Sequence, residues 1–347
     1  MTGICKKISL LILCASIFAG CSSRTSSDSD PMSYKTRDVF AMDTFMNIKA
    51  YGENAGKALT KAEERIYQLE KELSVTSEDS DVWALNHSGG SEVTVCEDTA
   101  GLIRKAIETG DSTGGALDIS IYPVLKKWGF TTEDYQVPEE NEIKELLSYV
   151  DYNKIELTGN KVRLDKNMEI DLGALAKGYT GDEIMAVIKD SGVNSAIVSL
   201  GGNVQAIGKK PDGSQWKIAV RDPFSTDQDM CVIEITDKAV ITSGNYERFF
   251  TDESSKNYWH ILDPKDGYPA DNGLVSVTVI GKSGIDCDAM STALFVMGFD
   301  KTVDFWKKGC DFDLILVTDD KKIYYTDGVK ESFKNLSSMP SEVIGSE

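Results

Sequence analysis

The chain has 347 residues, a formal net charge of −19 and 41% hydrophobic residues. This length and composition indicate a globular protein with one large domain or two closely joined ones. The acidic balance argues against a nucleic-acid-binding protein, which would show a basic face, and against charge-driven adsorption to anionic lipid.

The N-terminus differs in composition from the rest of the chain. Two lysines precede an apolar run from Ile8 to Phe18, and Ala19-Gly20-Cys21 follows. This order is typical of a signal peptide, and the run is shorter than the about 20 apolar residues that span a membrane. We expect a signal peptide over residues 1–20 and a flexible tether over 21–35, with an uncleaved anchor as the alternative. The Ala-Gly-Cys site resembles a bacterial lipoprotein processing site, which would lipidate Cys21 and hold the protein on the extracytoplasmic face of the cell membrane.

The folded part is expected over residues 36–337, with residues 338–347 as a C-terminal tail. Apolar residues at helical spacing predict helices over residues 54–73, 97–109, 139–150, 170–191, 284–298 and 302–308, with a short helix ending near residue 86. Alternating patterns predict strands over residues 34–51, a hairpin over 155–165, a strand over 196–203, and later strands in QAIGKK, WKIAVRDP, CVIEITD, KAVITSG, YWHILDP, GLVSVTVIG, FDLILVTD and KKIYYTD. Because helices lie early and strands late, with a helix inserted between strands, we predict an α+β fold of mixed layers and not a doubly wound sheet.

One late stretch, Gly284 to Gly298, places oxygen ligands near a helix start. Asp286 or the residue before it can cap this helix, and Asp288 and Thr292 then lie one turn apart on one face. A carboxylate and a hydroxyl near the positive end of a helix could hold Mg²⁺ and the phosphates that it carries. The structural alternative is an aspartate that complements the helix dipole and a threonine that bonds a carbonyl one turn back.

The chain has only two histidines, which narrows the search for a proton carrier. His260 lies at the end of a predicted strand and could act as a general base, although a histidine bonded to a turn carbonyl is the common structural reading. His87 lies in a polar loop. Lys177 occupies a helix start, where the dipole disfavours a cation, and a neighbouring phosphate would explain it.

The four cysteines beyond the leader are widely spaced, at positions 96, 231, 287 and 310. No CxxC pair exists, which argues against a zinc or redox site, and buried apolar roles are the expectation for these thiols. Other glycine-bounded polar stretches, each a weak signal alone, are ALDIS at 116–120, SLGGN at 199–203 and TSGNY at 242–246.

Taken together in their order, these segments resemble a known family. From about Ala41 to Gly298 the chain is similar to the bacterial FAD:protein FMN transferases, the ApbE-type flavin transferase lipoproteins. The blocks that carry the resemblance are AMDTFM, ELSVTSEDSDVWALN, GGALDISIYPVLKKWGF, IDLGALAKGYTGDEI, VSLGGNV, WKIAVRDP, ITSGNYERFF, HILDPKDGYPA and DAMSTALFVMG. The resemblance implies a single T-fold-like catalytic domain that binds FAD in a cleft between two lobes.

The resemblance also implies site residues and a reaction. Magnesium would bind the Ala174 carbonyl, Asp288 and Thr292, with Ser291 as a further candidate ligand, and His260 would be the catalytic base. Flavin contacts would fall on Met42, Ala116, Leu117, Asp118, Asp171, Lys177 and Ile261. The implied reaction attaches FMN from FAD to a threonine of a partner membrane or extracellular redox protein and releases AMP; the alternatives are an FAD pyrophosphatase and a non-catalytic flavin-binding lipoprotein. The chain departs from the family pattern at two positions. Asp43 replaces the glycine of an MGT segment, which could alter the entrance of the FAD site, and Ala174 stands where many members have a second glycine.

Overall fold

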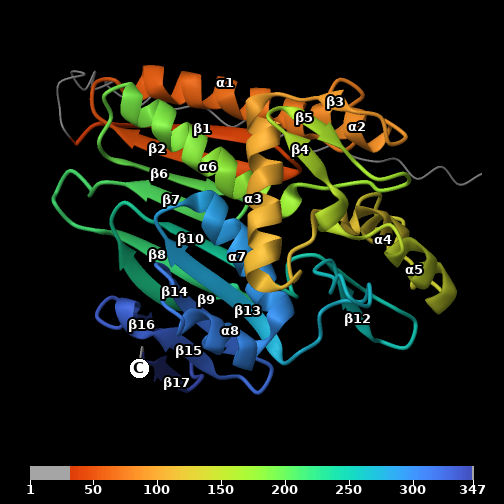
Figure 1. Cartoon of the computed structure of the whole chain (residues 1–347). Helices are drawn as coiled ribbons and strands as arrows, with labels where there is room; N and C mark the ends of the chain where they lie inside the picture. Colours follow the sequence, from red (N-terminus) through yellow and green to blue (C-terminus); the bar gives the residue numbers. More distant parts are fainter. Residues whose placement is uncertain (1–31, 346–347) are drawn as a thin grey trace, which may run out of the picture.

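The computed structural model describes residues 32–345, and a nine-stranded sheet forms its centre. The strands of this sheet, in chain order, are β1 (Tyr34–Ala41), β2 (Thr44–Tyr51), β6 (Ala196–Leu200), β7 (Asn203–Ile207), β10 (Ala239–Gly244), β13 (Leu274–Gly281), β14 (Asp313–Thr318), β15 (Ile323–Thr326) and β17 (Ser341–Ile344). They lie side by side in that same order (Figure 1). Neighbours pair antiparallel except β15 and β17, which are parallel.

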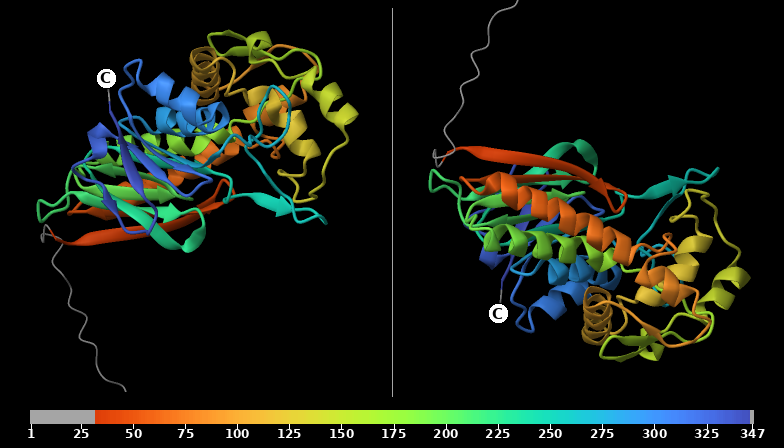
Figure 2. Two further views of the ribbon diagram at one scale, coloured as in Figure 1. Left: turned by 90° about the horizontal axis from the view of Figure 1, so that it is seen from below. Right: turned by 90° about the horizontal axis from the view of Figure 1, so that it is seen from above.

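Helices cover one face of this sheet, and others lie beside it. The α-helices of the described residues are α1 (Ala55–Leu73), α2 (Asp81–Asn86), α3 (Glu97–Thr113), α4 (Tyr122–Lys127), α5 (Glu140–Leu147), α6 (Gly173–Asp190), α7 (Gly284–Met297) and α8 (Phe299–Trp306). Helices α1 and α6 pack side by side over β1, β2 and β6, while α7 packs over β10 and β13 (Figures 1 and 2). The apolar stripe of α1, including Leu59, Ile66 and Leu69, is fully buried, as its helical spacing requires.

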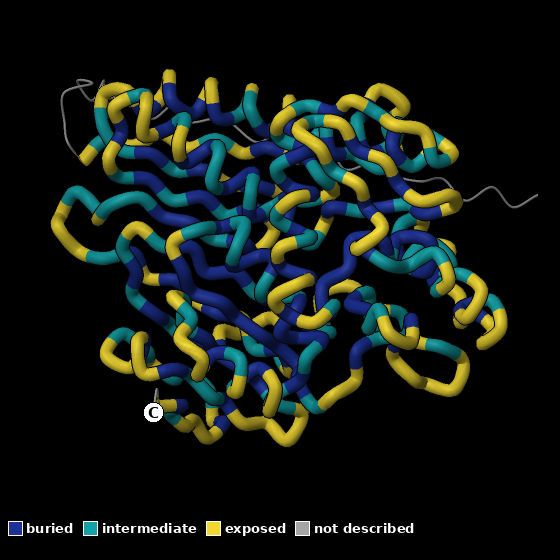
Figure 3. Tube along the Cα trace, viewed as in Figure 1, coloured by how far each residue is buried: buried dark blue, intermediate teal, exposed yellow. Residues whose placement is uncertain are grey.

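The other face of the sheet is covered by a smaller three-stranded sheet. Its strands are β8 (Trp216–Asp222), β9 (Ser225–Ile235) and β16 (Lys334–Asn335). Successive side chains of the central strands point to opposite faces of the sheet. Ile241 and Val279 pack with the helices on one face. Val240 and Ile280 pack with Trp216 of β8 on the other. The central strands are therefore buried on both faces, and exposure concentrates in the surrounding loops and helix surfaces (Figure 3).

A small hydrophobic cluster lies beside the main sheet. The hairpin of β11 (Phe249–Thr251) and β12 (Asn257–Trp259) projects away from the sheet toward α4 and α5 (Figure 2). Trp128 lies at the centre of this cluster, is fully buried, and donates its indole N–H to the Gly267 carbonyl at 2.9 Å. This packing fixes the position of His260, the residue immediately after β12.

The predicted α+β class is confirmed, and most predicted elements are present. The hairpin expected over 155–165 forms β4 (Glu156–Thr158) and β5 (Lys161–Arg163), which β3 (Val93–Thr94) joins. The helix expected from residue 170 begins at Gly173, because Asp171 accepts the Gly173 amide and turns the chain before the helix starts.

The C-terminal segment differs from the expectation. Residues expected to form a tail from 338 onward contribute β17, and Ile344 is buried against the core, so the folded domain extends past residue 337. The predicted signal peptide, most of the tether and Cys21 lie outside the described residues. Between residues 32 and 345, no helix combines the length and apolar content that a membrane crossing needs.

Candidate active site

Helices α6 and α7 approach closely at two glycines. A Cβ atom on Gly178 would lie 2.2 Å from the Gly284 carbonyl oxygen, a distance that no side chain could occupy. This close approach lets the Gly178 N–H donate to Oδ2 of Asp288 at 2.7 Å. The predicted metal ligand on α7 is thereby held against the first turns of α6.

The same contact places Asp288 near the Ala174 carbonyl. In a regular α-helix the Gly178 N–H points at the carbonyl oxygen of Ala174, four residues earlier. Two oxygens that each lie about 3 Å from one nitrogen lie within about 6 Å of each other. The predicted main-chain and carboxylate ligands therefore converge on one region.

Hydroxyl groups adjoin this region from α7 and β10. Ser243 of β10 forms hydrogen bonds with Ser291 at 2.8 Å and with Thr292 at 3.2 Å, both between hydroxyl oxygens. Ser291 also donates to the Asp288 carbonyl at 2.9 Å, within its own helix. Ser291 thus has two hydrogen-bond partners within the fold, whereas Thr292 bonds only Ser243 among the described residues and is the better-placed hydroxyl ligand.

The capping residue of α7 lies earlier in the chain than the sequence suggested. Ser283 caps the helix by accepting the Asp286 amide, and Asp182 of α6 accepts the Gly284 and Ile285 amides at 2.7 and 2.9 Å. The predicted cap at Asp286 or the residue before it is therefore wrong. Asp288 lies in the second turn, and α6 supplies the carboxylate that satisfies the exposed amides.

Two cations dominate the charge of the site. Lys177 and Arg248 have no carboxylate within ion-pair distance among the residues that the structure describes. Burial raises the pKa of Asp288 and of Asp171, and the Lys177 ammonium offsets part of that effect at both carboxyls. Two unpaired cations beside buried carboxyls are suited to bind an anion, such as a phosphate.

Glu247 is a titratable group that sequence reasoning missed. The residue is exposed at the surface, yet desolvation by the surrounding protein raises the pKa of its carboxyl group to about 7. The positive charges of Lys177 and Arg221 act in the opposite direction and offset part of this shift. Glu247 follows β10 directly, within the polar stretch that begins at Thr242. That stretch was recognisable in the sequence, but its partners on α6 and α7 were not.

His260 lies next to these cations. Burial, with Arg248 and Lys177 nearby, lowers its pKa to about 4, so the imidazole is neutral at physiological pH. Its Nδ1 lies 3.3 Å from the Arg248 carbonyl, which favours the tautomer with hydrogen on Nδ1 and leaves Nε2 as an acceptor. The other histidine, His87, stacks on Trp83 with ring centroids 3.9 Å apart and bonds the carbonyl of that residue, a structural role.

Met42 and Asp43 form the two-residue turn between β1 and β2. Both have positive φ, 52° and 54°, as a type I′ hairpin turn requires. Aspartate tolerates this conformation better than most residues, which accounts for Asp43 at a position where glycine was expected. The Met42 amide donates to Glu70 at 2.8 Å and fixes the turn on α1.

Several predicted flavin contacts are core residues. Ala116, Leu117 and Ile261 are at most 6% exposed and pack in the main hydrophobic cluster. Both oxygens of Asp118 are occupied: one accepts from the Ser120 amide and hydroxyl, the other from the Tyr152 amide. These side chains pack or hydrogen-bond within the fold, so the contacts they offer a ligand are expected from their backbone groups.

Two surface hollows lie away from this site. One, of about 540 Å³, lies beside the β4–β5 hairpin and includes Lys154 and Arg163; the other, of about 400 Å³, includes His87 and Tyr149. Neither hollow is lined by a ligand candidate from α6, α7 or β10. The candidate active site is therefore identified from the hydrogen bonds and charges of its residues and not from a surface hollow.

Comparison with known proteins gives a consistent result. The model of the ApbE family matches residues 42–316. The chain is 33% identical over 283 residues to an FAD:protein FMN transferase of Klebsiella pneumoniae, covering 79% of this chain and 87% of that protein. It is 29% identical over 325 residues to an FAD:protein FMN transferase of Treponema pallidum, covering 87% and 90%. The crystal structure of the ApbE protein of Thermotoga maritima superposes with a TM-score of 0.82 at 32% identity, covering 87% of this chain and all of that one.

Proposed function

The chain belongs to the ApbE family, and on this premise we propose that it transfers FMN from FAD to a threonine of a partner protein, with Mg²⁺, and releases AMP. Its class, a transferase, is the one named for its relatives. The observation that supports the finer proposal is the hydrogen bond from Gly178 to Asp288, which holds this carboxylate against the helix that carries Ala174.

The donor set fits magnesium. Asp288 supplies a carboxylate, Thr292 a hydroxyl and Ala174 a carbonyl, and a small hard cation prefers such oxygens. Asp288 is only 4% exposed and burial raises its pKa, so a cation beside it would restore its charged form. When bound, Mg²⁺ would draw negative charge from the phosphate oxygens of FAD.

The chain's own residues supply binding and proton transfer. Lys177 and Arg248 would hold the pyrophosphate of FAD and stabilise the charge that grows on it. The threonine hydroxyl of the partner attacks the phosphorus on the riboflavin side, a new P–O bond forms, and the P–O bond to AMP breaks. His260 Nε2 would accept the hydroxyl proton and return it to solvent or to the departing AMP.

Bound phosphates would also adjust His260. The pKa of this imidazole is held down by burial and by two neighbouring cations. Negative charge on a bound pyrophosphate would offset Lys177 and Arg248, so the imidazole would become a stronger base when the substrate is present.

The N-terminal leader supports a location for this activity. We propose that Cys21 carries lipid and holds the domain on the extracytoplasmic face of the membrane, where the acceptor would be a membrane or extracellular redox protein. A Cys21→Ser variant should leave the membrane fraction and appear in soluble extracts. Retention of that variant in the membrane would contradict the lipid anchor.

The function is tested by incubating the protein with FAD, Mg²⁺ and a threonine-containing acceptor peptide. The expected products are AMP and a peptide that carries FMN as a phosphoester on threonine, identified by mass spectrometry. The same peptide with threonine replaced by alanine is the control. FMN and AMP without labelled peptide would show an FAD pyrophosphatase, and intact FAD would show a binding protein.

A further inference from the structure

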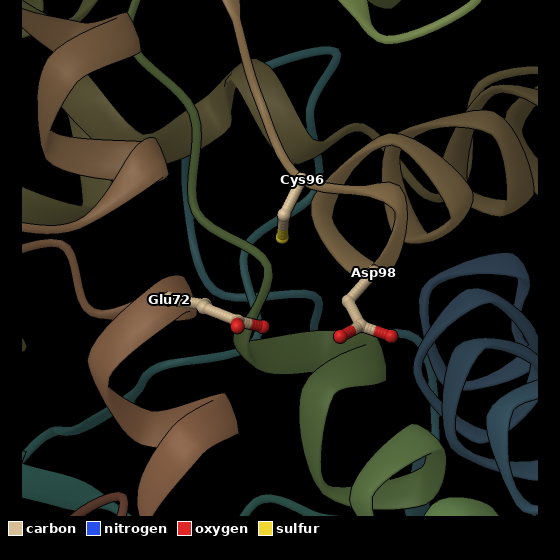
Figure 4. A group of neighbouring side chains, drawn as sticks. All are labelled: Glu72, Cys96 and Asp98. Carbon is tan, nitrogen blue, oxygen red and sulfur yellow. The ribbon is translucent and has the colours of Figure 1, made fainter.

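Three potential metal ligands meet outside the candidate active site. Glu72 lies in the last turn of α1, Cys96 caps α3, and Asp98 lies in the first turn of α3. One ligand atom from each lies within 4.8 Å of the other two. The two carboxyl groups point toward each other and the sulfur points toward the space between them (Figure 4).

One oxygen of the cluster is buried and lacks a donor in the described part of the chain. Oε2 of Glu72 is buried and has no hydrogen-bond partner among the described residues. Arg65 and Tyr179 both donate to Oδ1 of Asp98, so Oδ2 receives neither of these donors. A buried carboxylate oxygen without a donor is costly, and its natural partner is a proton or a cation.

The charges around the cluster also favour a cation. The one guanidinium of Arg65 pairs with both Asp98 and Glu183, and no lysine or arginine pairs with Glu72 among the described residues. The carboxyl groups in and beside the cluster therefore outnumber the cations that pair with them.

The thiol determines which cation suits the cluster. The sulfur of Cys96 lies beside the carboxyl oxygens of Glu72 and Asp98. A thiophilic cation can displace the thiol proton to solvent and form a metal–sulfur bond, whereas Mg²⁺ prefers oxygen ligands alone. The cluster thus differs in chemistry from the oxygen ligands on α6 and α7.

We propose that Glu72, Cys96 and Asp98 bind a divalent cation of the zinc class, with water as the remaining ligand. The cation links the end of α1 to the start of α3. Through Tyr179 it also restrains α6, the helix that carries Lys177 and Gly178. The expected role is structural, because no residue of the cluster is among the ligand candidates of the active site.

The test uses the full-length protein, stripped of metal and then given Co²⁺ in the presence of excess Mg²⁺, which occupies sites of oxygen ligands. A thiolate-to-cobalt absorption band in the near ultraviolet is expected, with one Co²⁺ per chain. Cys96→Ser should abolish the band. Cys310→Ser, which alters another partly exposed thiol away from the cluster, should retain it.

Zn²⁺ provides a second measurement that does not depend on sulfur. It should raise the unfolding temperature of the wild-type protein, and Glu72→Gln should weaken Zn²⁺ binding at least 10-fold while leaving the circular dichroism spectrum unchanged. Absence of the cobalt band and of any Zn²⁺-dependent stabilisation in the wild type would overturn the proposal and assign a shared proton to the carboxyl pair. A band that survives in Cys96→Ser would also overturn it.

Discussion

The Gly178 amide and the Asp288 carboxylate are joined by a 2.7 Å hydrogen bond across the interface of α6 and α7. One bond thus fixes the distance between a mid-sequence helix start and a late helix. The packing of the two helices depends on it, and the proposed metal site is built around it.

Asp288→Asn should reduce FMN transfer by about 10²-fold or more, because a neutral amide would bind Mg²⁺ more weakly than a carboxylate does. Excess Mg²⁺ should restore part of the activity by mass action. Initial rates across a Mg²⁺ titration provide the measurement. Asp286→Asn is the matched control, since Asp286 lies on the same helix, pairs with Lys105 and is 49% exposed. Full activity of Asp288→Asn in the presence of a chelator would contradict the metal role.

Gly178→Ala should destabilise the fold and weaken Mg²⁺ binding together. The added Cβ would meet the Gly284 carbonyl oxygen at 2.2 Å, so the two helices must separate. Overpacking of this kind typically costs about 1–3 kcal/mol, which urea denaturation can measure. Gly56→Ala in α1 meets no atom within 4 Å and should be neutral or slightly stabilising. Equal stability of the two variants would show that the helices do not need this close contact.

His260→Ala should leave FAD binding intact and slow transfer by about 10²-fold or more. Equilibrium titration with FAD and single-turnover rates separate these two effects. His87→Ala removes a histidine that stacks on Trp83 and should not change the rate. Unchanged transfer in His260→Ala would leave another group as the base.

The pH profile tests whether His260 or the neighbouring titratable group Glu247 is the base. The pKa of His260 is about 4 and that of Glu247 is about 7 in the free protein. If His260 is the base, kcat/KM should stay high from neutral pH down to about pH 5 and fall below it. An acidic limb near pH 7 that disappears in Glu247→Gln would instead identify Glu247.

Asp182 should make stability depend on pH. Burial raises its pKa from 3.8 to about 6, despite hydrogen bonds from the Ile285 and Gly284 amides. A carboxyl whose folded pKa is raised contributes its full stability below the unfolded value and loses it as pH rises through the folded value. The unfolding temperature of the wild type relative to Asp182→Asn should therefore decrease between pH 4 and pH 7. An increase over that range would show that the ionised carboxylate is the favoured cap of α7.

The sequence by itself determined the elements and the family. The apolar stripe of α1 and the strand alternation of β10 and β13 appear in the chain at their expected spacing, because burial on one or two faces sets those periods. The ordered polar blocks around Asp288, His260 and Lys177 identified the family and the residues of the candidate site.

Only the tertiary structure decided which of these residues meet. The hydrogen bond from Gly178 to Asp288 joins positions 110 residues apart in the chain, and Glu72 and Cys96 meet through the packing of α1 against α3. Such contacts arise from how the helices pack on the sheet, and no local pattern encodes them. The same packing places the Tyr152 amide where it donates to the buried Asp118 carboxyl group, and it pairs Ile344 with the edge of the sheet. Buried backbone and carboxyl groups need hydrogen-bond partners, and the fold supplies these from distant parts of the chain.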